Sequence, residues 1–173
     1  KSFIPTVLQA SSKFKVPVHV ENDGNCAALA EAHFGAGKGK NNFVLLTLGS
    51  GIGGGIILNK KLYKGNGAGG EVGSMIIHDE KIFEHFASGN ASVKIAREKL
   101  QMGNITSFEL EQKANQGNKT ALKVYDEIGK YLGIGLSNLA YILDPDVFII
   151  GGGFSRVKHI YKEMQKSFDE HYK

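Results

Sequence analysis

The segment Thr47–Leu58, TLGSGIGGGIIL, contains five glycines and raises the question of a nucleotide-binding loop. Gly49, Gly51 and Gly54 match the dinucleotide-binding pattern G-x-G-x-x-G. That pattern requires a helix after the glycine turn, because the pyrophosphate binds at the helix N-terminus. The residues that follow, Gly55–Leu58, are β-like, so the match is weak. A P-loop is excluded as well, because no G-K-[S/T] closes the segment.

The same segment fits a hairpin, with a strand, a tight glycine turn and a second strand. Such a tip exposes backbone N–H groups, and glycines let an anion approach them closely. Ser50 adds a hydroxyl donor to this turn. A purely structural hairpin that needs positive φ angles explains the loop equally well, so phosphate binding stays open on these residues alone.

The surrounding pattern predicts an α/β fold with a mixed sheet, because strands alternate with both helices and hairpins. The predicted strands are Val16–Glu21, Phe43–Leu48, Gly55–Leu58, Lys61–Tyr63 and the fully apolar Val147–Ile150, which is typical of a sheet buried on both faces. The predicted helices are Cys26–Phe34, most of Ile82–Leu100 with a break near Ser88, Ser107–Asn115 with Ser107 as its cap, Lys119–Leu143, and roughly Val157–His171 directly after Gly151–Gly153.

Composition excludes several classes of protein. The chain has 173 residues, enough for one domain or two small lobes, and a formal net charge of +4. Its lysines are scattered or lie in probable turns, so a nucleic-acid interface is not indicated. The single cysteine, Cys26, excludes an internal disulfide and a cysteine metal cluster. No apolar run approaches a membrane span and no signal-peptide pattern opens the chain, so the cytoplasm is the expected compartment.

Four blocks of sequence resemble one family when they are taken together. They are Glu21–Glu31 (ENDGNCAALAE), the hairpin around Gly49, Gly69–Gly73 (GGEVG) and Asp144–Gly153 (DPDVFIIGGG). Their order and spacing resemble the ROK family of bacterial sugar kinases and sugar-responsive repressors. The resemblance runs from about Val16 to the last helix and implies the hexokinase-type, actin-like ATPase fold, which is ribonuclease H-like.

The resemblance implies roles for four polar residues. Asp23 corresponds to the family's catalytic aspartate, a carboxylate that accepts the proton of a sugar hydroxyl as the γ-phosphoryl group transfers. The alternative is that Asp23 or Asn25 merely caps the following helix, which is worth roughly 1 kcal/mol. Asn22, Glu71 and Glu84 resemble ligands of sugar hydroxyls, although glutamates at such positions are commonly loop or helix-surface charges.

The resemblance also implies a nucleotide site and the cofactors ATP and Mg²⁺. Gly49, Ser50 and Gly51 look like the family's second phosphate loop. Gly151, Gly152 and Gly153 look like the turn on the adenosine side, where a strand ends at a helix N-terminus that favours anions. Close packing of the strand against the helix is the alternative explanation for the triple glycine.

Two departures from the family pattern matter. Ser74 stands where most members have a zinc-binding histidine, and Met75–Ile82 lacks the C-x-C-G-x-x-G-C segment, so we expect no zinc. His78 and His85 lack the further ligands that tetrahedral coordination requires. The first phosphate loop, D-x-G-G-T, is also absent. We therefore expect residues 1–173 to form a single lobe, the C-terminal part of a two-lobe kinase, which alone would be inactive.

Three functions remain open at this stage. The first is ATP-dependent phosphorylation of a hexose, with a homodimer as the expected assembly and no membrane partner. The second is a sugar-responsive transcriptional regulator, which would bind nucleic acid only through a helix-turn-helix domain upstream of this chain. The third is a non-catalytic module that binds a sugar or a nucleotide. Retention of Asp23 favours the kinase, because a pure sensor does not need a base.

Overall fold

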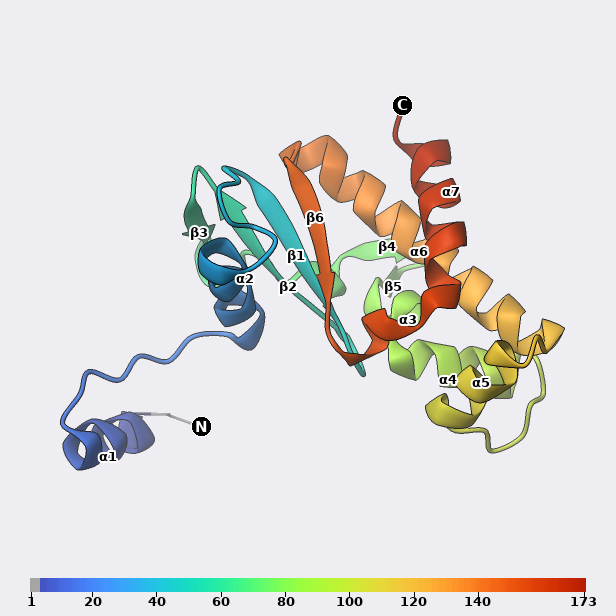
Figure 1. The fold of residues 1–173 in the computed structure, drawn as a ribbon, viewed down its shortest axis with the longest axis horizontal. Helices are drawn as coiled ribbons and strands as arrows, with labels where there is room; N and C mark the ends of the chain where they lie inside the picture. Colours follow the sequence, from blue (N-terminus) through green and yellow to red (C-terminus); the bar gives the residue numbers. More distant parts are fainter. Residues whose placement is uncertain (1–3) are drawn as a thin grey trace.

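The computed structural model describes residues 4–173 and contains a four-stranded mixed sheet in the order β3-β2-β1-β6 (Figure 1). Strand β1 (Phe43–Leu48) pairs antiparallel with β2 (Ile52–Leu58) and parallel with β6 (Val147–Gly151). Strand β3 (Lys61–Tyr63) completes the sheet beside β2. The predicted α/β class and mixed sheet are confirmed.

The sheet separates two hydrophobic cores. Alternate residues of β1 point to opposite faces. Phe43 and Leu45 face a small core beneath helix α2 (Asp23–Phe34). Val44 and Leu46 face the larger core. That core includes buried residues of α3 (Glu84–Ala87), α4 (Gly89–Glu98), α5 (Ser107–Asn115) and α6 (Lys119–Leu143).

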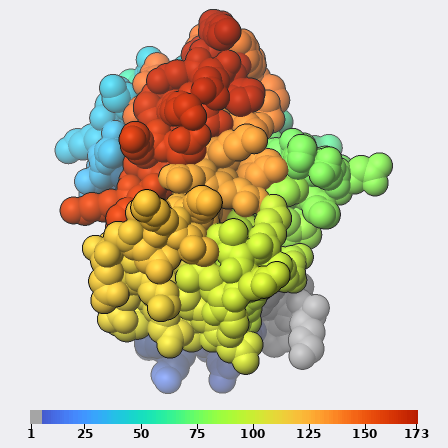
Figure 2. All heavy atoms as spheres, turned by 90° about the vertical axis from the view of Figure 1, so that its right-hand side faces the viewer, coloured from blue at the N-terminus to red at the C-terminus, as the bar shows by residue number. Residues whose placement is uncertain are grey.

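Glycines allow α7 (Tyr161–His171) to lie along α6, as Figures 1 and 2 show. A Cβ on Gly129 would lie 2.4 Å from the Ile160 carbonyl oxygen, and one on Gly133 would lie 2.6 Å from that of Met164. Helix α6 has the predicted bounds. Asn118 caps its N-terminus by accepting hydrogen bonds from the first turn.

The same principle explains the misleading glycine pattern in β2. A Cβ on Gly24 in α2 would lie 2.3 Å from the Gly54 carbonyl oxygen, and one on Gly55 would lie 2.6 Å from the Ala28 Cβ. Helix α2 therefore packs directly on the backbone of β2. Gly54, the third glycine of the G-x-G-x-x-G match, makes room for a different segment, because a Cβ on it would lie 2.7 Å from Val72 Cγ2 and 2.9 Å from the Gly70 carbonyl oxygen. Strand β2 begins at Ile52, earlier than predicted.

The predicted strand Val16–Glu21 was wrong, because this segment is irregular. A strand needs a hydrogen-bonded neighbour, and none of the described strands pairs with it. Pro17 also lacks an N–H donor. The segment links the body of the molecule to α1 (Ile4–Phe14), a helix that was not predicted and lies apart in Figure 1.

Other differences concern the ends of elements. Thr106, not Ser107, caps α5, because Thr106 and Glu109 form a reciprocal capping box. Two short 3₁₀ turns, η2 (Gly153–Arg156) and η3 (Lys158–Ile160), separate the triple glycine from α7. Both faces of β6 are covered as predicted, since Val147 and Ile149 pack against the small core and Phe148 and Ile150 against the larger one. The strand lies at the sheet edge, so only Ile149 of its residues is buried.

Residues between β3 and α3 add a 3₁₀ turn, η1 (Val72–Ser74), and a hairpin of β4 (Ile76–His78) and β5 (Lys81–Ile82) that the sequence did not predict. The hairpin projects from the surface, coloured green at the right of Figure 2. Among residues 4–173, no helix is both long and apolar enough to cross a membrane.

Candidate functional site

The N-terminus of α2 presents the first candidate residues. Asn22 is the N-cap, and its Oδ1 accepts a hydrogen bond from the Asn25 N–H at 3.1 Å. Asp23 is the first helical residue; its side chain is exposed, and its Oδ1 accepts from the Gly24 N–H at 2.9 Å. The capping role considered for Asp23 or Asn25 therefore belongs to Asn22.

The same asparagine reaches a second candidate that lies 49 positions away. Asn22 Nδ2 donates to Glu71 Oε1 at 3.0 Å. The turn after Glu71 is held close to β2, because a Cβ on Gly73 would lie 2.0 Å from the Ile52 carbonyl oxygen. Two predicted sugar ligands therefore lie in direct contact, next to Asp23.

Glu21 holds the turn that carries Asn22 and Asp23. Its Oε1 accepts from the Asn22 N–H and from Asn25 Nδ2, both at 3.0 Å, and its carboxylate pairs with Lys64. These interactions, the hydrogen bond from Lys64 foremost, lower the pKa of Glu21 to about 2. Lys64 begins the loop that leads to Glu71, so the ion pair ties that loop to the turn before Asp23.

The β1–β2 hairpin tip is held by backbone hydrogen bonds. The Gly49 N–H donates to the Gly51 carbonyl at 3.0 Å, while the Gly49 and Ser50 carbonyls accept from the Gly89 and Asn90 N–H groups of α4 at 2.9 and 3.2 Å. The N–H groups of Ser50 and Gly51 take no part in these bonds. A Cβ on Gly49 would meet nothing within 4 Å, so this side of the tip is open to a ligand.

The triple glycine contains residues with different surroundings. Gly151 ends β6 beside Thr47. Gly152 has φ +89°, and a Cβ on it would lie 2.3 Å from the Leu48 carbonyl oxygen, so the backbone requires glycine here. Gly153 faces open space. Close packing therefore explains Gly152, against a strand rather than a helix, but does not explain Gly153.

These elements converge around one pocket of about 340 Å³. Asp23, Glu84 and Gly152 line it together with the hairpin tip, Gly49–Gly51. Glu84 Oε2 lies 3.4 Å from the Ile52 backbone nitrogen, which places this carboxylate beside the tip. The structure thus brings candidates from four separate segments to one pocket. Asn22 and Glu71 do not line it, but they contact each other next to Asp23.

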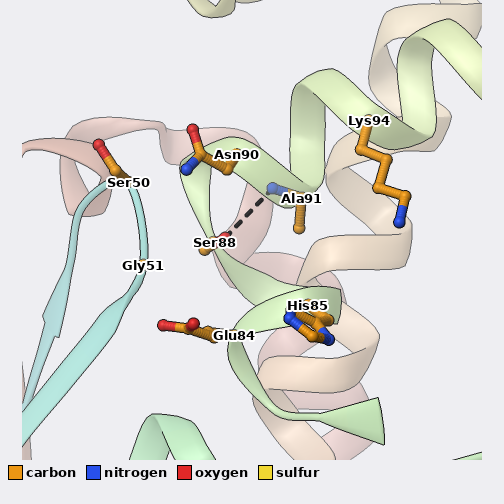
Figure 3. A pocket seen from close by; sticks show the side chains of 8 residues that line it. All are labelled: Ser50, Gly51, Glu84, His85, Ser88, Asn90, Ala91 and Lys94. Atoms are coloured by element: carbon orange, nitrogen blue, oxygen red, sulfur yellow. Dashed lines mark hydrogen bonds between the residues drawn. The ribbon is translucent and has the colours of Figure 1, made fainter.

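Two neighbouring pockets contain residues that the sequence did not indicate. One lies on the Gly153 side of the tip and is also lined by Ser107 and Glu111 of α5. The other lies beyond Glu84 and reaches Lys94 of α4 (Figure 3). No motif marks these positions, because they are ordinary polar residues on helices and only the fold places them near the tip.

Within residues 4–173, no group of three or more His, Cys, Asp or Glu side chains is placed to hold a metal ion. His78 instead packs against the rings of Phe86 and Tyr131, with centroids 5.7 and 5.6 Å away. The N–H groups of Ser50 and Gly51, unbonded within the described residues, are donors that suit a phosphate approaching from the open side at Gly49. Magnesium fits this chain only as an ion bound mainly by nucleotide phosphates and water, which is its usual mode.

Comparisons with known proteins agree with this geometry. Residues 3–173 match the model of the ROK family. The chain is 36% identical to a glucokinase of Streptomyces coelicolor, covering 87% of this chain and 56% of that protein. It is 33% identical to a xylose repressor of Bacillus spizizenii, covering 87% of this chain and 40% of that protein. The chain thus spans about half the length of these curated relatives.

Solved structures show the same fold. A ROK family glucokinase from Streptomyces griseus, in complex with glucose and AMPPNP, superposes with a TM-score of 0.83 at 32% identity, over 96% of this chain and 62% of that one. A ROK hexokinase from Thermus thermophilus gives 0.88 at 29% identity, over 96% and 60%. The fold is therefore the hexokinase-type, actin-like ATPase fold, and the chain belongs to the ROK family.

Proposed function

We propose that residues 1–173 form the C-terminal lobe of an ATP-dependent hexose kinase, with Asp23 as the general base. The observation that carries this proposal is that Asp23, Glu84 and the hairpin tip Gly49–Gly51 line one pocket. Direct phosphoryl transfer requires the base for the acceptor hydroxyl and the donors that bind the transferred phosphate to lie in the same pocket. Residues 1–3 of the proposed lobe lie outside the part that the structure describes.

The surroundings of Asp23 support its proposed role as the base. The Gly24 N–H holds one carboxylate oxygen, which orients the side chain. The other oxygen makes no hydrogen bond within the described residues and is free to accept a proton from a sugar hydroxyl. Because Asn22 caps the helix, the charge of Asp23 adds only the smaller attraction of a first-turn carboxylate to the helix dipole.

The sugar is held mainly by carboxylates in this proposal. Glu71 and Glu84 accept hydrogen bonds from hydroxyl groups, and such bonds to a charged acceptor are among the stronger ones. Asn22 contributes chiefly by orienting Glu71, because its amide is already bonded on both sides.

The nucleotide binds along the other side of the tip. The N–H groups of Ser50 and Gly51 donate to phosphate oxygens, and the open surface at Gly153 leaves room for the nucleoside beyond Gly151 and Gly152. When bound, Mg²⁺ neutralises charge on the phosphates. The first phosphate loop would come from an N-terminal lobe, so this chain alone should not catalyse turnover.

A sugar-responsive regulator is the second candidate function. The xylose repressor of Bacillus spizizenii is as similar to this chain as several kinases are. In that case the pocket would bind an effector sugar, and an upstream DNA-binding domain would respond to it.

The test uses the full-length protein with Mg²⁺, ATP and a panel of hexoses, and measures ADP release. We expect sugar-dependent turnover in the wild type, and a loss of at least about 10²-fold in kcat for Asp23→Asn with the sugar Kd little changed. The urea midpoint of Asp23→Asn should match the wild type, which shows that the fold is retained. Sugar binding without turnover in the wild type would refute the kinase and support the regulator.

A further inference from the structure

A second pocket adjoins the proposed sugar site and has a volume of about 380 Å³. It shares Ser50, Gly51 and Glu84 with the pocket that contains Asp23. Asn90 and Lys94 of α4 line it along one side, with Asn90 pointing toward Ser50, and Lys94 and His85 lie at the end away from the hairpin tip (Figure 3). His85, Asn90 and Lys94 are not part of the proposed kinase machinery. A ligand in the sugar site can therefore extend into this space without leaving the protein surface.

The two ends of this pocket differ in charge. Glu84 points toward the hairpin tip, whereas Lys94 lies at the opposite end, above His85 (Figure 3). Asn90 and Lys94 are four residues apart and so share one face of α4. Within residues 4–173, Lys94 forms no ion pair, and the side chains of Asn90 and His85 make no hydrogen bond.

The free side chains that α4 contributes to this pocket, Lys94 at the end away from the hairpin and Asn90 beside Ser50, are mainly hydrogen-bond donors (Figure 3). Lys94 offers three N–H donors and a full positive charge, and Asn90 offers two more. The first backbone N–H groups of α4 are already bonded to the Gly49 and Ser50 carbonyls and to the Ser88 hydroxyl. A ligand at this end is consequently held by side chains, with the positive end of the helix adding a weaker attraction.

We infer that this pocket binds an anionic substituent, a phosphate or a carboxylate, on the hexose whose hydroxyl groups reach Asp23 and Glu84. The inference rests on the proposed sugar site and narrows its ligand to an anionic sugar. A compact oxyanion offers only acceptors, which match the donors of Lys94 and Asn90, and charge-assisted bonds to it are short and strong. Glu84 at the other end matches hydroxyl donors, so the polarity of the pocket follows that of a sugar phosphate or sugar acid.

The experiment compares glucose, glucose 1-phosphate and glucose 6-phosphate by calorimetric titration into the full-length protein. We expect one sugar phosphate to bind about tenfold or more tightly than glucose. Lys94→Met should abolish this preference and leave the glucose Kd unchanged, whereas Lys94→Arg should keep most of it. Lys123→Met, an exposed lysine of α6 that lines none of these pockets, is the matched control and should behave as wild type.

Equal affinities for glucose and both phosphates, or a preference that survives in Lys94→Met, would overturn the inference. Titration with inorganic phosphate reports whether Lys94 binds an anion that has no sugar attached. We expect inorganic phosphate to compete with the bound glucose phosphate but not with glucose. Transfer from ATP is measured separately with the same samples. If a sugar phosphate binds more tightly than glucose through Lys94 but no phosphoryl transfer from ATP occurs, the kinase is contradicted and the anionic subsite is supported. If transfer occurs but a sugar phosphate binds no more tightly than glucose, the kinase is supported and the anionic subsite is contradicted.

Discussion

The two sides of the candidate site use different chemical groups, backbone groups on one side and side chains on the other. On the proposed nucleotide side, Gly49–Gly51 and Gly152 present backbone groups, and their positions are fixed by hydrogen bonds and by close contact with β1. On the proposed sugar side, Asn22 and Glu71 meet through side chains from segments 49 positions apart. A substitution on the nucleotide side therefore acts through the backbone and the fold, whereas one on the sugar side acts through affinity and charge.

Gly152→Ala should give the largest effect on stability. The residue has φ +89°, and its new Cβ would lie 2.3 Å from the Leu48 carbonyl oxygen. Left-handed strain and this clash together should lower the free energy of unfolding by about 3 kcal/mol or more. Urea unfolding of the two proteins measures the difference.

Gly153→Ala is the control for that experiment. A Cβ on Gly153 would meet nothing within 4 Å, and its φ is not in the positive range. We expect a change in unfolding free energy of less than about 1 kcal/mol. Equal losses in both variants would show that the turn is not held against Leu48 as the structure has it.

Glu71→Gln should change affinity rather than stability. The substitution keeps the size of the side chain but removes the charge that the proposed sugar contact uses. The Kd for the sugar should rise by about tenfold or more, because hydrogen bonds to charged groups are worth roughly 1.5–3 kcal/mol. Nucleotide affinity and the urea midpoint should stay close to wild type.

Glu80→Gln is the matched control for charge. Glu80 is exposed in the turn between β4 and β5 and lines none of the described pockets. It should leave the sugar Kd unchanged. A similar loss in both variants would mean that net charge, and not the position of Glu71, governs sugar binding.

Much of the fold could be predicted from the sequence, since the apolar patterns of β1 and α6 are clear and local. The proximity of Asn22 and Glu71 could not be predicted from either segment alone, because it depends on the packing of η1 against β2. Sequence reasoning also failed where tertiary context decides. Val16–Glu21 has a strand-like composition, yet no described strand lies beside it.

The glycines also show that a sequence pattern can combine residues with different structural roles. The pattern Gly49, Gly51 and Gly54 mixes a hairpin tip with a packing contact to Val72, and only the structure separates the two. Pockets lined by Lys94 or Glu111 carry no sequence signal, because a polar residue on an amphipathic helix looks like solvent-exposed surface. The sequence motifs therefore indicated the proposed reacting groups but not the residues of the pockets around them.

Substitutions of Asn22 should have moderate effects on both stability and sugar affinity. Loss of the cap in Asn22→Ala should lower the free energy of unfolding by about 1 kcal/mol. Asn22→Asp keeps an oxygen acceptor for the Asn25 N–H but replaces the donor to Glu71 with a carboxylate. We expect Asn22→Asp to approach wild-type stability only at high ionic strength, where salt screens the repulsion between the new carboxylate and Glu71, and to bind the sugar more weakly. Urea unfolding and calorimetry measure the two effects, and wild-type sugar affinity would refute the role of the Asn22–Glu71 contact.

Glu21→Gln should give the smallest change in unfolding free energy, and the pH dependence of that change tests whether the ion pair with Lys64 causes it. The folded-state pKa of Glu21 is lowered from 4.5 to about 2, chiefly by Lys64. A lowered pKa means that the charged form stabilises the fold above the unfolded-state pKa and that this contribution is lost as the pH falls toward 2. Lys64 and Glu21 are partly exposed, so the contribution is small and screened by salt. The difference in unfolding free energy between wild type and Glu21→Gln should be constant near neutral pH and should shrink between pH 4.5 and 2. Lys64→Met should remove most of that pH dependence, because the ammonium group is its first cause. A difference that grows on acidification would contradict the ion pair, and would leave the turn before Asp23 held by Asn22 and Asn25 alone.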